Sequence, residues 1–156
     1  GIDIDKDGNV YVADWRNDRI QKFSPDGQFL MTFGSSGQGE GEFNRPTGVA
    51  VDKDGTIYVA DYKNDRLQVF NADGRFITQL MDEATLSKWG TERVKLDPLI
   101  GRGREIAQGL EEREKAFQGP IAVDVDDEGR VFVVEVSRHR VQVFYKQTAD
   151  FSGGPL

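Results

Sequence analysis

The chain has 156 residues, a formal net charge of −7 and no cysteine. The lack of cysteine excludes disulfides, thiolate nucleophiles and sulfur-ligated metals, and the negative charge disfavours non-specific nucleic-acid binding, which depends on neutralising phosphates. No apolar run approaches the length of a membrane span. We therefore expect neither nucleic acid nor a membrane as a partner, and no sequence feature assigns a compartment.

An internal repeat organises the sequence. Residues 1–14 align without a gap with residues 48–61, and the match continues with 17–23 against 64–70 and 26–29 against 73–76. A third copy begins at Pro120 and, after a turn that we expect to be two residues longer, continues through 131–135 and 138–144. A period of roughly 40 to 50 residues is typical of propeller blades.

Each copy predicts four short strands. In the second copy they span 49–52, 57–61, 66–70 and 75–80, and these segments are rich in β-branched and aromatic residues. Asp54-Gly55 and Ala72-Asp73-Gly74 supply the tight turns that join them in pairs. Four-stranded antiparallel sheets that repeat along the chain indicate an all-β protein built of β-propeller blades.

The amino-acid motifs of the repeat identify its family more specifically than its length does. Three motifs carry it, Pro46-Thr-Gly48-Val-Ala-Val-Asp52, Ile57-Tyr-Val-Ala-Asp61 and Asn64-Asp-Arg-Leu-Gln-Val-Phe70, and the third copy ends in Arg138-His139-Arg140-Val-Gln-Val-Phe144. These motifs resemble the NHL repeat. The resemblance implies three NHL blades, at 1–45, 46–80 and 120–156, with an insert at 81–119. NHL propellers host protein binding, RNA binding and lyase chemistry, so the resemblance does not select an activity.

The resemblance also implies a ring of six blades, of which this sequence provides three. The outer faces of the first and last blades are expected to be apolar and to need a neighbour. Two partners fit: a second copy of the chain, which would give a homodimer that closes the ring, or the missing blades of a longer chain.

The insert has a different composition from the repeats. Residues 82–90 predict a short helix with Gly90 as its stop, 96–98 break the chain, and 104–117 predict a second helix. One interpretation is a helical cap that buries Trp89, Leu110 and Phe117 against the blades. The other is a lid or recognition element over the mouth of the propeller.

The order of strands divides the loops between two sides of the propeller. The Asp-Gly turns lie on one side, whereas the loops between second and third strands, the Gly-rich loop 34–45 and the insert lie on the other. Variable aromatic and basic residues in loops over a rigid scaffold favour ligand binding. The candidate ligand-binding residues are Trp15, Arg16, Tyr62, Lys63, Trp89, Arg138 and His139.

Metal and catalytic motifs are weak. Asp3, Asp5, Asp7 and Asp14 have the spacing of an EF-hand calcium loop, but the residues after Gly8 read as a strand, which would carry Asp14 away from the turn. We therefore assign no metal and no cofactor. His139 is the only histidine, too few for the histidine clusters that the resemblance associates with NHL enzymes.

An acid precedes an arginine by five residues in every copy, as Asp14 and Arg19, Asp61 and Arg66, and Glu135 and Arg140. Because a catalytic residue is needed only once, the recurrence predicts a structural contact that closes the loop. We expect a non-catalytic scaffold that binds a protein, peptide or small ligand, with no catalytic residue assigned. The alternative is a propeller-type lyase or lactonase-like enzyme with its site in the central channel.

Overall fold

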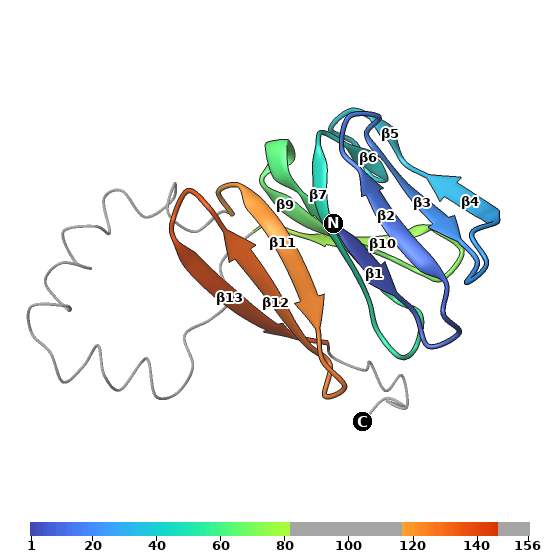
Figure 1. Cartoon of the computed structure of the whole chain (residues 1–156). Coiled ribbons are helices and arrows are strands. Elements are labelled where there is room, and N and C mark those ends of the chain that lie inside the picture. Colours follow the sequence, from blue (N-terminus) through green and yellow to red (C-terminus); the bar gives the residue numbers. More distant parts are fainter. Residues whose placement is uncertain (82–116, 147–156) are drawn as a thin grey trace, which may run out of the picture.

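The computed structural model describes residues 1–81 and 117–146, which form three antiparallel sheets side by side (Figure 1). The first blade contains β1 (Ile2–Ile4), β2 (Val10–Asp14), β3 (Arg19–Phe23) and β4 (Phe29–Phe33). The second contains β7 (Pro46–Val51), β8 (Ile57–Asp61), β9 (Arg66–Phe70) and β10 (Phe76–Leu80), and the third contains β11 (Pro120–Val125), β12 (Arg130–Glu135) and β13 (Arg140–Tyr145). Strands pair in chain order within each sheet. The expected all-β propeller-blade fold is confirmed.

Two small elements lie in the loops. β5 (Ser35–Ser36) and β6 (Glu42–Phe43) form a parallel pair inside the Gly-rich loop, and η1 (Tyr62–Asn64) is a 3-10 turn between β8 and β9. The predicted helices at 82–90 and 104–117 lie outside the described residues except for Phe117. The predicted fourth strand of the third blade would follow residue 146, the last described residue, and so also lies outside the described part of the chain. Within residues 1–81 and 117–146 no helix is long and apolar enough to cross a membrane.

The first turn of each blade is built by one aspartate. Asp52 Oδ1 accepts hydrogen bonds from the amides two and four residues later, and Gly55 takes the positive φ of +83° that such a turn needs. Asp126 and Gly129 repeat this arrangement in the third blade. The expected longer turn is wrong, because Asp126 and not Asp124 begins it, and all three turns have the same length.

Two apolar layers hold the blades together. Alternate residues of a strand point to opposite faces, so each face of the second blade packs on a different neighbour. The layer between blades one and two comprises Tyr11, Ala13, Ile20, Phe43, Val49, Val51, Ile57, Val59 and Phe70. The layer between blades two and three comprises Ala50, Tyr58, Leu67, Val69, Phe117, Val131 and Val133. The second blade is therefore buried on both faces.

One phenylalanine fills the junction ahead of each of the last two blades. Phe43 and Phe117 each lie three residues before the proline that opens the next blade, and both are almost fully buried. The Phe117 ring packs on the Phe144 ring, with their centroids 5.6 Å apart. The expectation that an aromatic residue of the insert packs on the propeller is confirmed for Phe117, whereas Trp89 and Leu110 lie outside the described residues.

The first strands of neighbouring blades approach very closely. A Cβ atom built on Gly48 would lie 3.0 Å from the Cα of Ala122, a backbone atom of the third blade. A glycine is therefore required there by the packing of β7 against β11.

The two outer blade faces remain exposed. Ile2 of blade one is 68% exposed, whereas Val49 at the same repeat position in blade two is 3% exposed. Val141 of blade three is 58% exposed, whereas its counterpart Leu67 is fully buried. The same apolar pattern thus continues onto faces that carry no neighbouring blade among the described residues.

Candidate functional site

An acid–arginine pair closes the loop between the second and third strands of every blade. Arg19 Nε lies 2.9 Å from Asp14, Arg66 Nε lies 2.8 Å from Asp61, and Arg140 Nε contacts Glu135. The predicted contacts are confirmed in all three copies. Their environments differ, because the Arg19 side chain is 40% exposed and that of Arg66 only 4%.

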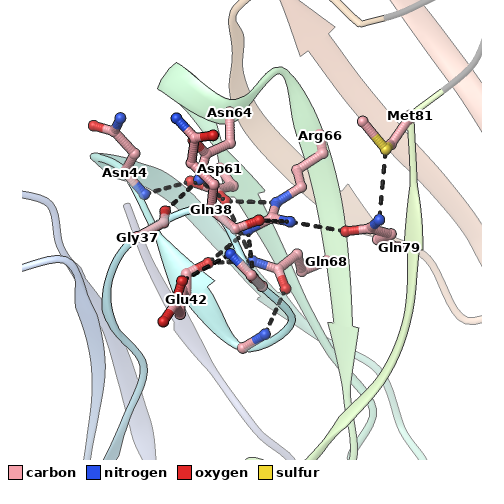
Figure 2. A network of polar contacts seen from close by, with 12 residues as sticks. Gly37, Gln38, Glu42, Asn44, Asp61, Asn64, Arg66, Gln68, Gln79 and Met81 are labelled. Atoms are coloured by element: carbon pink, nitrogen blue, oxygen red, sulfur yellow. Dashed lines mark hydrogen bonds and ion pairs between the residues drawn. The ribbon is translucent and has the colours of Figure 1, made fainter.

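Arg66 anchors the Gly-rich loop to the second blade (Figure 2). Its guanidinium donates hydrogen bonds to Asp61, to Gln79 Oε1 and to the carbonyl oxygens of Gln38, Gly39 and Glu42. All five donor–acceptor distances are 2.8 or 2.9 Å. A planar guanidinium suits this role, since its N–H groups point in several fixed directions.

The Asp61 carboxylate occupies the centre of the same network and is fully buried. It accepts hydrogen bonds from the Asn44 amide, the Asn64 side chain and the Gln68 side chain, in addition to the Arg66 pair. The network joins β8, β9 and the loop that leads into the second blade, so that this loop is held against a rigid sheet.

A second set of aspartates links each blade to the next. Asp18 and Asp65 have left-handed backbones with φ of 49° and 51°, and their carboxylates accept hydrogen bonds from the amides of Arg45 and Gly119, both at 2.7 Å. Each acceptor thus holds the residue that precedes the opening proline of the next blade. His139 occupies this position in the third copy, with φ of 50°.

The junction of the first two blades presents an exposed aromatic residue with two cations close to its ring. Trp15 is 45% exposed. The guanidinium carbon of Arg16 lies 5.0 Å from the centroid of the Trp15 ring, and that of Arg45 lies 5.9 Å away, both within the range of cation–π attraction. Neither arginine has an ion-pair partner among residues 1–81 and 117–146.

A hollow of about 420 Å³ lies beside this cluster. Its lining consists of Trp15, Arg16, Asp18, Asn44 and Arg45. Residues from the β2–β3 loop of blade one and from the entry to blade two therefore share one surface. We call this set the Trp15 hollow.

The corresponding loop of the second blade adjoins the Trp15 hollow. The Lys63 amide donates a hydrogen bond to the Asn44 carbonyl at 3.0 Å, and the Lys63 ammonium lies 4.8 Å from the centroid of the Tyr62 ring. A smaller hollow of about 250 Å³ is lined by Gln38, Lys63, Asn64, Asp65, Arg66 and Met81. We call the side of the blades that carries the β2–β3 and β8–β9 loops the loop side. It presents two aromatic residues with cations beside them, Trp15 with Arg16 and Arg45, and Tyr62 with Lys63, and the Asn44–Lys63 hydrogen bond joins the two loops.

The family model for the NHL repeat matches residues 1–23, 43–70 and 117–144, together about half of the chain. The chain belongs to the NHL-repeat family. No curated protein is similar enough in sequence to count as a relative.

Solved structures share the fold of these NHL blades. A structural genomics protein of unknown function from Bacteroides thetaiotaomicron has 21% identity and a TM-score of 0.57, over 88% of this chain and 32% of its own. The hydrazine synthase of Kuenenia stuttgartiensis has 11% identity and a TM-score of 0.52, over 93% and 35%. A protein of unknown function from Bacteroides caccae has 14% identity and a TM-score of 0.53, over 86% and 37%. The chain spans about a third of the length of each.

The structure brings some of the predicted ligand-binding residues together and leaves others apart. Trp15 and Arg16 meet in the Trp15 hollow, and Tyr62 and Lys63 lie next to it. Arg138 and His139 lie in the equivalent loop of the third blade, between β12 and β13, and neither is among the described residues that line the hollow. Trp89 is outside the described residues. Sequence reasoning missed Asn44 and Arg45, although both stand directly before the Pro46 that opens the second repeat.

The acids with EF-hand spacing have separate roles in the NHL blades. Asp3 accepts a hydrogen bond from the Val51 amide of blade two, Asp5 closes its own turn, and Asp14 pairs with Arg19. Hydrogen bonds from Asn17 and the Arg19 charge hold the pKa of Asp14 below its ordinary value of 3.8. In the part of the chain that is described, no group of three or more His, Cys, Asp or Glu side chains is placed to hold a metal ion.

Proposed function

We propose that this NHL segment is a non-catalytic binding scaffold that takes a protein, peptide or small ligand on its loop side. The observation that carries the proposal is the Trp15 hollow, where an exposed indole lies beside two arginines that have no ion-pair partner in the described part of the chain. Exposed tryptophan and arginine are the residues that most often dominate binding energy at interfaces.

Rigidity beneath the hollow supports the same function. The Asn44 backbone is fixed on both sides, since its amide donates to Asp61 and its carbonyl accepts from Lys63. Arg45 is fixed by the hydrogen bond from its amide to Asp18. Binding residues held in a single arrangement lose little conformational entropy when a ligand binds.

The opposite side of the blades offers a contrast. Its turns are occupied by their own hydrogen bonds, in which Asp5, Asp52 and Asp126 cap neighbouring amides. These side chains are used to build the turns. On the loop side, by contrast, Arg16 and Arg45 lie beside the exposed Trp15 ring and have no ion-pair partner within residues 1–81 and 117–146.

Peptide display tests the proposal directly. A library of displayed random peptides is selected against the immobilised chain, and the enriched peptides are measured by fluorescence anisotropy against the variants Trp15→Ala and Lys6→Ala. Loss of affinity of about ten-fold or more in Trp15→Ala, with Lys6→Ala unchanged, would support the scaffold, because truncating an anchoring tryptophan removes a dominant contact. An absence of enriched peptides, or peptides that bind both variants equally, would contradict it.

A further inference from the structure

Arg45 has a backbone conformation that is unusual for its residue type. Its φ is +57°, in the left-handed region where side chains other than those of glycine, asparagine and aspartate are disfavoured. The equivalent residue before the third blade is Gly119, with φ of +64°. The fold therefore needs a left-handed residue before each opening proline, and the second blade fills the position with arginine at a cost in stability.

A side chain at this position reaches the loop of the preceding blade. At Gly119, an added Cβ would lie 3.0 Å from the Tyr62 ring and 3.1 Å from Val136, so a side chain there would force these neighbours to shift. At Arg45 the side chain is present and exposed, and its guanidinium lies against Trp15. Strained residues that persist in a fold cluster at functional sites, which makes Arg45 a candidate for a direct role in binding.

The charges of the Trp15 hollow favour an anionic group. Arg16 and Arg45 both approach the Trp15 ring, and Asp18, the acid among the described lining residues, already accepts hydrogen bonds from the Arg45 amide and the Ser36 hydroxyl. Neither guanidinium group has an ion-pair partner among the described residues, so both can bind a carboxylate with paired N–H donors.

We propose that the Trp15 hollow recognises an acidic peptide segment, with Arg16 and Arg45 bound to its carboxylates and Trp15 packed against its chain. This inference rests on the proposed function of the loop side. A peptide is favoured over single-stranded nucleic acid because the described residues of the Trp15 hollow and the adjoining Tyr62 loop supply three cations, Arg16, Arg45 and Lys63, in a chain with a net charge of −7. Surfaces that bind nucleic acids usually carry a longer row of cations, which contacts successive phosphates of the backbone.

Tryptophan fluorescence gives a direct test. The chain contains two tryptophans, so in a Trp89→Phe background the emission reports on Trp15 alone. Three probes are titrated: the peptide (Glu-Ser)4, its uncharged counterpart (Gln-Ser)4, and an octauridylate. We expect a saturable change with (Glu-Ser)4 that weakens with added salt, and no saturable change with the other two.

Arg45→Gly is the decisive variant. Glycine relieves the left-handed strain, so we expect the melting temperature to be unchanged or higher while the affinity for (Glu-Ser)4 falls about ten-fold, as expected when a charge-assisted hydrogen-bonding partner is lost. Arg75→Ala, an exposed arginine after a turn on the opposite side, removes the same charge and should leave the affinity unchanged.

Each other outcome contradicts the inference. Equal affinity of Arg45→Gly and the parent, equal response to (Gln-Ser)4, or tighter binding of octauridylate would overturn recognition of a peptide carboxylate. If Trp15 responds to none of the probes while displayed peptides still depend on Trp15, the acidic preference fails and the scaffold remains. If no displayed peptide depends on Trp15, the scaffold fails as well.

Discussion

Replacing Arg66 with alanine removes the guanidinium that holds the Gly-rich loop in the network of Figure 2. The Arg66 side chain is 4% exposed, and its guanidinium makes five hydrogen bonds, one of them to the fully buried Asp61. Breaking a buried ion pair costs about 3–5 kcal/mol because the remaining charge is left uncompensated. Asp61 would keep donors from Asn44, Asn64 and Gln68, so we expect a loss near the lower end, about 3 kcal/mol in the free energy of unfolding and on the order of 10 °C in melting temperature.

The first blade supplies a matched control. Arg19 occupies the same repeat position and pairs with Asp14, but its side chain is 40% exposed, so Arg19→Ala should cost only about 0–1 kcal/mol. Urea denaturation followed by circular dichroism measures both variants. A loss below about 1 kcal/mol in Arg66→Ala, or an equal loss in Arg19→Ala, would refute the account of the network.

Three other predictions concern the packing of the blades. Gly48→Ala should destabilise the fold by about 1–3 kcal/mol in urea denaturation, because the new Cβ would meet the Cα of Ala122; a neutral substitution would contradict the close approach. Burial raises the pKa of Asp52, but the Lys146 ammonium and nearby hydrogen bonds outweigh it and leave that pKa below 3.8. A carboxyl group whose pKa is lowered in the folded state contributes fully to the free energy of unfolding above its unfolded pKa, and this contribution is lost as the pH falls through the folded pKa. Lys146→Ala should therefore reduce the loss of unfolding free energy below about pH 4. An unchanged dependence of stability on pH in this variant would contradict the role of the Asp52–Lys146 ion pair. We also propose that two chains form a homodimer through their exposed outer blade faces. Light scattering at micromolar concentration should then give twice the mass of one chain for the wild type and the mass of one chain for Val141→Asp. A wild-type protein with the mass of one chain would exclude this dimer.

The repeat carried enough information to predict the blades and the acid–arginine pairs. Both depend on residues close together in sequence, such as the Asp54-Gly55 turn and Asp61 with Arg66. The turn of the third blade is harder to predict because two aspartates, Asp124 and Asp126, precede Gly129, and pairing Asp124 with Asp52 makes the turn two residues too long. The spacing of three residues between Asp126 and Gly129, the same as in the other two blades, is the signal that identifies the correct aspartate.

Only some residues of the candidate site can be predicted from the sequence. Trp15 and Arg16 could be placed on the loop side from strand order alone. Their contact with Arg45 depends on how two blades pack, since the Asp18–Arg45 hydrogen bond joins residues 27 positions apart. The position before the opening proline, filled by Arg45 in one copy and Gly119 in another, holds the sequence clue to a left-handed backbone.

The central claim is that ligands bind on the loop side at the junction of the first two blades. An amide chemical-shift map of the 15N-labelled chain, recorded during titration with a peptide selected by display, tests it most directly. The account predicts that the largest shifts fall on residues 15–18 and 44–45, while residues 6–8 and 53–55 of the opposite turns stay unchanged. Shifts that concentrate in those turns, or that spread along β1, β7 and β11 and leave Trp15 unmoved, would contradict it.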